Sequence, residues 1–264
     1  DTLREVALQL TVLDGDLPQW GWFGNLPALG NTQYLPTLGA WGGNFINDEE
    51  TEVILDTPES REALQFWADI IHVDKSAPTP AESESFQGDA WTSGRVGMRP
   101  AASWNAPSWS TYGDFNWDVA PLPAGPAGRA TNSFGSGYSI TKNSGHPDDA
   151  WEYLSEYLSE EGMIFMWGNT GRGSPAREAG YLAWVDSPVA PENAEYFIDA
   201  LNEYAVTGHP YQTLGAAELD AVQSRELTLV RSGETDVDSA VIAIVEEGQA
   251  VLDEATERFK EKYS

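Results

Sequence analysis

Residues 55–71 read LDTPESREALQFWADII, and this stretch joins a helix start to a helical apolar stripe. Thr57 is placed to cap the helix, Pro58 suits its first turn, and Glu59 lies near the positive end of the helix dipole. The apolar residues then recur at helical spacing, at Ala63, Phe66, Trp67, Ile70 and Ile71. This pattern predicts an amphipathic helix with one buried face.

Working outward from this helix, short strand candidates alternate with longer helices. The strand candidates are Arg95–Arg99, Trp117–Leu122 and Gly137–Thr141. A helix is expected after His146, with its apolar residues facing inward, namely Ala150, Trp151, Leu154 and Leu158. The last helix, about residues 236–260, keeps one apolar face throughout. Short strands between longer helices predict an α/β fold that is rich in helix.

Composition excludes several kinds of protein. The chain has 264 residues, 14 Lys and Arg, 42 Asp and Glu, and a net charge of −28. Such a charge repels nucleic-acid phosphates, so no nucleic-acid partner is expected. The scarcity of lysine is typical of adaptation to salt, and a strongly solvated acidic surface is the alternative. Without cysteine, the chain has no disulfide, thiolate metal site or cysteine nucleophile.

Histidines give no sign of a metal site, because the three are far apart in the sequence and lack a ligand spacing such as His-x-x-x-His. We therefore expect no metal and no cofactor. The 11 tryptophans are more informative. Many lie in Gly-, Pro- and Ser-rich stretches, where an indole ring can stack on a ligand while its N–H finds a partner.

Several short phrases follow one another in a distinctive order. They occupy residues 40–43, 55–64, 94–104, 117–123, 137–140, 146–152, 173–177 and 232–234. This order resembles the family 1 extracellular solute-binding proteins of ABC transporters, the maltose-binding-protein-like sugar-binding proteins. Each phrase alone is weak, but the series covers nearly the whole chain.

The resemblance implies a periplasmic-binding-protein type II fold of two lobes. Residues 1–136 would form most of the second lobe, 137–187 part of the first, and 188–264 would return to second-lobe helices. Family members begin with a β-α-β-α stretch, whereas Leu3–Thr11 looks like a later helix. The first lobe is therefore expected to be incomplete, and the chain to self-associate through the helix after His146.

By the same resemblance, the chain would bind a carbohydrate, most simply an oligosaccharide, in a cleft between two lobes and deliver it to the permease subunits of an ABC importer. It would act outside the cell or in the periplasm, anchored by lipid in the complete protein. An enzyme is not expected. A glycoside hydrolase remains the alternative from another class, and a non-sugar solute such as a phosphorylated polyol the alternative ligand.

A sugar site needs aromatic rings for the apolar face of the pyranose and polar groups for its hydroxyls. Trp104 lies where the family stacks a sugar, with a core tryptophan as the alternative. Trp41 either faces the ligand or packs beneath the turn at Gly42. Arg172 offers a fork of donors or is one more surface charge. The remaining candidates are Asn31, Tyr34, Trp109, Asn169, Gly171 and Tyr211.

Overall fold

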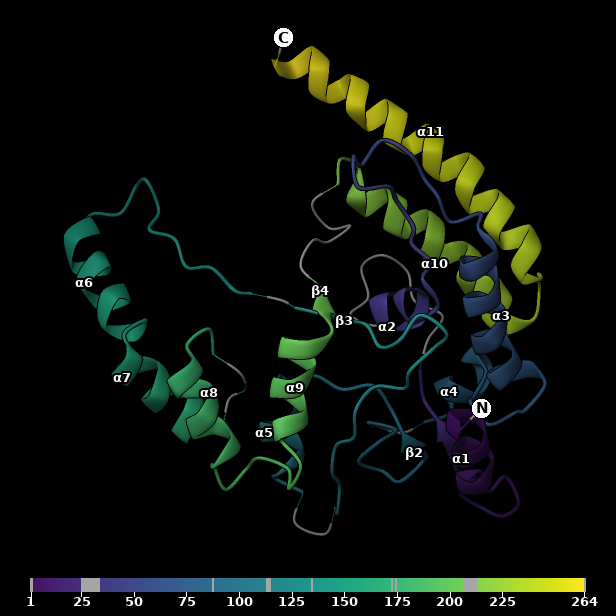
Figure 1. Ribbon diagram of the computed structural model, residues 1–264, viewed down its shortest axis with the longest axis horizontal. Helices are drawn as coiled ribbons and strands as arrows, with labels where there is room; N and C mark the ends of the chain where they lie inside the picture. The colour runs from purple at the N-terminus through teal and green to yellow at the C-terminus, as the bar shows by residue number, and fades with distance from the viewer. Residues whose placement is uncertain are drawn as a thin grey trace. The chain divides into compact units, whose positions relative to one another are not determined.

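The computed structural model describes residues 2–24, 34–86, 88–112, 115–133, 135–171, 173, 175–206 and 213–263 (Figure 1). The chain divides into two compact units. Unit 1 comprises Asp1–Pro100, Leu122–Asn132 and Ala205–Ser264, and unit 2 comprises Ala101–Pro121 and Ser133–Tyr204. The lobe boundaries predicted after residues 136 and 187 stay a prediction.

Unit 1 contains most of the regular structure. Its elements are α1 (Thr2–Leu10), β1 (Trp20–Trp22), α2 (Tyr34–Leu38), η1 (Gly39–Trp41), α3 (Pro58–His72), α4 (Pro80–Glu84), β2 (Val96–Met98), β3 (Thr131–Asn132), β4 (Ala205–Val206), α10 (Ala216–Ser232) and α11 (Val237–Tyr263). Strands β1 and β2 pair in parallel, with Trp20 opposite Val96, and so do β3 and β4, with Thr131 opposite Ala205. The strand predicted at Arg95–Arg99 is thus confirmed as β2.

The predicted first helix is confirmed as α3, and its cap forms as expected. The Thr57 side chain accepts a hydrogen bond from the Ser60 N–H at 3.2 Å. The apolar stripe of α3 is buried in the core of unit 1. Helices α10 and α11 lie side by side and supply further core residues, among them Leu219, Ile244 and Leu252 (Figure 1). Gly233 ends α10 in the left-handed conformation, where a side chain would be strained.

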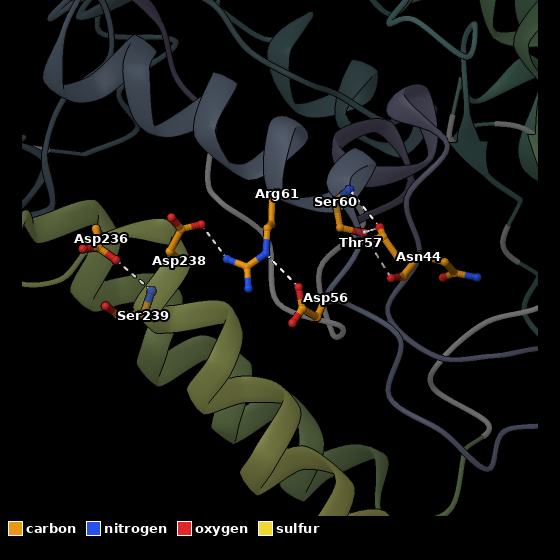
Figure 2. A network of polar contacts seen from close by, with 8 residues as sticks. All are labelled: Asn44, Asp56, Thr57, Ser60, Arg61, Asp236, Asp238 and Ser239. Atoms are coloured by element: carbon orange, nitrogen blue, oxygen red, sulfur yellow. Dashed lines mark hydrogen bonds and ion pairs between the residues drawn. The ribbon is translucent and has the colours of Figure 1, made fainter.

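A surface ion pair joins the start of α3 to the start of α11. Arg61 Nε lies 2.8 Å from an oxygen of Asp56, and another guanidinium nitrogen lies 2.5 Å from Asp238 (Figure 2). The hydrogen bond from Arg61 lowers the pKa of Asp56 below its ordinary value, although burial opposes this slightly. The ion pair therefore links the starts of two helices that are far apart in the sequence.

Unit 2 is built from shorter elements. They are η2 (Ser103–Asn105), α5 (Ala106–Trp109), α6 (Pro147–Tyr157), α7 (Glu160–Met163), the π-helical segment η3 (Ile164–Asn169), α8 (Glu178–Val185) and α9 (Glu195–Glu203). Its core surrounds Trp184, which is fully buried against Tyr181 and Phe197. Helix α7 continues directly into η3, and α8 packs on η3.

Three predictions for residues 117–158 are wrong. Neither Trp117–Leu122 nor Gly137–Thr141 forms a strand, because neither segment pairs with another among the described residues, and Pro121 has no N–H to offer a ladder. Helix α6 forms, but none of its residues Pro147–Tyr157 is buried. Trp151 is 67% exposed, since the only helix that α6 contacts substantially within the described chain is α7.

Candidate functional site

Trp104 stands out in unit 2 as an exposed indole on a well-anchored turn. It lies in η2, between Ser103 and Asn105. Its side chain is 52% exposed, although Ser103 and Ala106 on either side of the turn are buried. The Asn105 side-chain oxygen accepts a hydrogen bond from the Ala102 N–H at 3.0 Å, which closes the turn. The local structure therefore presents a large apolar ring to the surface from a fixed backbone.

The next tryptophan along, Trp109, has a different setting. It is buried at the end of α5, and its ring meets that of Trp117 edge to face, with 5.2 Å between centroids. Trp117 in turn packs on the core around Trp184. In this arrangement Trp109 supports the turn that carries Trp104, while its own contact with ligand stays a prediction.

The glycine-rich loop after η3 is the second feature of the site. Gly171 has φ +68°, its N–H donates to the Gly168 carbonyl, and its carbonyl accepts from Trp184 Nε1 at 3.1 Å. A Cβ at this position would collide with Val189. Asn169, at the end of η3, is exposed, so its amide can donate to and accept from a ligand.

The loop and Trp104 meet at Gly173. A Cβ at Gly173 would lie 3.3 Å from Trp104 Cα and 3.4 Å from Trp104 N. Two segments that the sequence marked independently thus adjoin within unit 2. The contact joins the turn that carries the exposed Trp104 ring to a glycine-rich loop, and a sugar site needs both an aromatic ring and polar groups.

A third contact fixes the backbone next to this region. Asp118 accepts hydrogen bonds from the backbone N–H of Asn193, at 3.0 Å, and from the Asn193 side chain. Burial acts to raise the pKa of Asp118, but the N–H groups of Asn193 and Val119 outweigh it and lower the pKa. Asp118 is thereby held as a carboxylate that joins the segment after Trp117 to the start of α9.

Comparison with known proteins identifies the family of the chain. The sequence profile of the bacterial extracellular solute-binding proteins matches residues 1–164, more than half of the chain. The chain belongs to that family. No protein of curated function matches it.

Solved structures of similar fold place this family member among the type II periplasmic binding proteins, as predicted. An ABC substrate-binding protein from Listeria monocytogenes in complex with cycloalternan is 21% identical, with a TM-score of 0.77 over 98% of this chain and 63% of that one. The GacH receptor of Streptomyces glaucescens, solved also with acarbose, is 21% identical, with a TM-score of 0.72 over 95% of this chain and 63% of that one.

A third similar structure is the cyclic α-maltosyl-1,6-maltose binding protein from Arthrobacter globiformis. It is 23% identical, with a TM-score of 0.71 over 95% of this chain and 63% of that one. This solute-binding chain therefore spans less than two thirds of the length of these relatives. The likeness shows a two-lobe α/β fold, rich in helix.

The remaining predicted site residues of this family member belong to unit 1 or lie outside the described residues. Trp41 belongs to unit 1, where its partly buried ring packs 4.9 Å from Phe66 and 6.2 Å from Trp67, centroid to centroid. These contacts are of the kind expected if Trp41 packs beneath the turn at Gly42, and a contact of Trp41 with ligand stays a prediction. Tyr34 begins α2, but its side chain is outside the described part. The other three candidates, Asn31, Arg172 and Tyr211, also lie outside the described residues.

Sequence reasoning missed two contacts in this region. The partners Asp118 and Asn193 are 75 residues apart, and neither carries a local signal for the other. Gly173 was part of a recognised phrase, but its contact with Trp104 depends on the fold. Among the described residues, no group of three or more His, Cys, Asp or Glu could hold a metal ion. No helix in the described ranges is long and apolar enough to span a membrane.

Proposed function

We propose that the chain is part of the solute receptor of an ABC importer and that its ligand is a carbohydrate held against Trp104. The observation that carries this proposal is the half-exposed Trp104 on a closed turn whose backbone adjoins Gly173. A protein normally buries most of a tryptophan surface, so an indole displayed from a fixed backbone is suited to a ligand with a flat apolar face.

The chemistry of the neighbouring groups suits a neutral, hydroxyl-rich ligand. One face of a pyranose ring is lined by C–H groups and stacks on an indole, while its hydroxyls require donors and acceptors around the rim. The exposed amide of Asn169 provides both. A net charge of −28 disfavours anionic ligands such as phosphorylated polyols.

The similar structures support an oligosaccharide in particular. The ligands of three of them are cycloalternan, acarbose and cyclic α-maltosyl-1,6-maltose, which are all built of several sugar-like rings. We therefore propose an oligosaccharide of glucose-like units as the ligand class.

We take the function to be binding without catalysis. A glycoside hydrolase needs one carboxyl group kept protonated as general acid, with a raised pKa, and a second carboxylate nearby. The carboxylate closest in sequence to Trp104 with a resolved shift, Asp118, has a lowered pKa and is occupied by Asn193. This chemistry supports a structural role for Asp118. A reducing-sugar assay beside each binding titration separates hydrolysis from binding.

The proposal also covers the location of the protein and its partners. The family description supports a site of action outside the cell or in the periplasm. There the receptor would pass its ligand to permease subunits, with a lipid anchor in the complete protein. Self-association through α6 is a further part of the proposal, because that helix exposes Trp151 and Tyr153.

Trp104→Ala tests the binding role by calorimetric titration with a series of malto-oligosaccharides. Loss of a stacking anchor is expected to weaken binding by about 1–3 kcal/mol, or about 5- to 150-fold in Kd. The matched control is Trp151→Ala, an exposed tryptophan of the same unit outside the site, for which Kd should not change. Equal affinities of wild type and Trp104→Ala would contradict the proposal.

A further inference from the structure

Gly173 lies against the backbone of Trp104. The nearest atoms to a Cβ built at Gly173 are Cα and N of Trp104, at 3.3 and 3.4 Å, followed by the carbonyl carbon of Ser103 at 3.6 Å. Gly173 itself has φ +130°, a conformation that residues with a Cβ rarely adopt. Two separate constraints therefore act at this one position.

The backbone that Gly173 contacts is held in place by its surroundings. Ser103 is buried, Ala106 after the turn is buried, and Asn105 closes the turn onto Ala102. A methyl group at 173 would crowd the Cα of Trp104 by a few tenths of an ångström, and we expect the closed turn to shift as a unit. Since the indole is attached to that Cα, its ring would be displaced with it.

We propose that Gly173 is a positioning residue for Trp104: the absence of a side chain at 173 sets the place of the indole in the ligand site. This inference rests on the proposed function. Gly171 does not share this role, because the obstacle at Gly171 is the side chain of Val189. The glycine-rich loop thus contains one position that keeps the loop packed and another that sets the ligand-stacking ring.

The chain offers matched controls for the backbone strain. Gly128 has φ +112° and Gly15 has φ +119°, and a Cβ at either would meet nothing within 4 Å. Alanine at these two positions is strained in the backbone, as at 173, but pushes on no neighbour. These variants show whether a strained alanine far from the site alters binding, and the double-mutant cycle decides whether a loss at 173 acts through Trp104.

The experiment is a double-mutant cycle with Gly173→Ala and Trp104→Ala, titrated with the malto-oligosaccharide that binds best. Gly173→Ala alone should weaken binding about tenfold, within the range expected for Trp104→Ala itself. In the Trp104→Ala background it should change Kd less than about twofold, because the ring that it displaces is gone. Neither control glycine variant should change Kd.

The outcomes distinguish a failure of the proposed function from a failure of the role given to Gly173. If Trp104→Ala leaves Kd unchanged, the proposed function fails. If Trp104→Ala weakens binding but Gly173→Ala does not, or if the two losses simply add, Gly173 does not act through Trp104 and the inference is overturned.

A measurement without substitution at 173 covers the case in which Gly173→Ala does not fold. In protein labelled with ¹⁵N-glycine, sugar should shift the Gly173 amide resonance in wild type and leave it in place in Trp104→Ala. A Gly173 resonance that ignores sugar in wild-type protein, under conditions where the Trp104 ring responds, would also overturn the inference.

Discussion

Unit 1 and unit 2 differ in the size of their apolar cores and in how far their aromatic side chains are buried. In unit 1, α3, α10 and α11 bury their stripes in one large cluster that includes Leu64, Ile70 and Ile244. In unit 2, the core around Trp184 has few buried members, and aromatic side chains such as Trp104 and Trp151 are more than half exposed. The difference teaches that one large apolar cluster stabilises unit 1, whereas unit 2 has a smaller core and leaves several aromatic side chains in water.

The largest expected effect comes from one substitution made in both units. Leu64→Ala removes a side chain that is 1% exposed in α3 and should lower the free energy of unfolding by about 2–5 kcal/mol. Leu154→Ala removes a partly exposed side chain from α6 and should cost less than about 1 kcal/mol. Urea unfolding followed by circular dichroism measures both. Equal costs would break the comparison between the units.

Two exposed aromatic residues of α6 lead to a second, smaller effect. Trp151 and Tyr153 are 67% and 66% exposed, and apolar patches of a few hundred Å² tend to find a partner. We expect self-association that strengthens with added salt, because salt screens the repulsion between chains of charge −28. Light scattering across a salt series measures it.

Replacing Trp151 and Tyr153 of α6 by serine should weaken that self-association about tenfold or more. Serine at Leu8 and Ile242, exposed apolar residues of unit 1, is the control and should leave it unchanged. A chain that stays monomeric at every salt concentration would contradict the role given to α6.

The smallest effect is expected at the ion pair of Figure 2. Arg61→Gln should lower the free energy of unfolding by no more than about 1 kcal/mol, because Asp56 and Asp238 are both well exposed and water screens the pair. High salt should reduce the difference between variant and wild type further.

The pH dependence of this pair has a definite sign. The pKa of Asp56 is lower in the folded chain than its ordinary value of about 4. Its contribution is therefore fully present above that value and is lost as the pH falls through the folded pKa. Arg61→Gln should flatten the fall in stability below about pH 4, as followed by urea unfolding at a series of pH values. A steeper fall in the variant would contradict this assignment.

Local signals explain which parts of the fold the sequence could predict. The start of α3 depends on Thr57 and Pro58, and the end of α10 depends on Gly233, all within one turn of the boundary that they set. The strand candidates Trp117–Leu122 and Gly137–Thr141 failed because a strand needs a partner, which its own residues do not specify. The burial of α6 failed for a related reason, since an apolar stripe does not say what covers it.

The candidate site divides along the same line. Trp104 could be singled out because it lies in a Ser-Trp-Asn-Ala-Pro turn and the family order pointed to it, while its contact with a ligand stays a prediction. Its contact with Gly173 and the bond between Asp118 and Asn193 join segments that lie about 70 residues apart. Only the folded chain brings such pairs together, so no local pattern could have revealed them.

The central claim is that Trp104 is the ring on which a carbohydrate stacks. ¹⁹F NMR of the chain labelled with 5-fluorotryptophan tests it most directly, because it detects weak binding and reports each of the 11 tryptophans separately. The Trp104 resonance, assigned by its loss in Trp104→Phe, should shift progressively as malto-oligosaccharide is added. The buried Trp67 and Trp184 should keep their positions. A Trp104 resonance that stays fixed at millimolar sugar, while another tryptophan shifts or none does, would contradict the account.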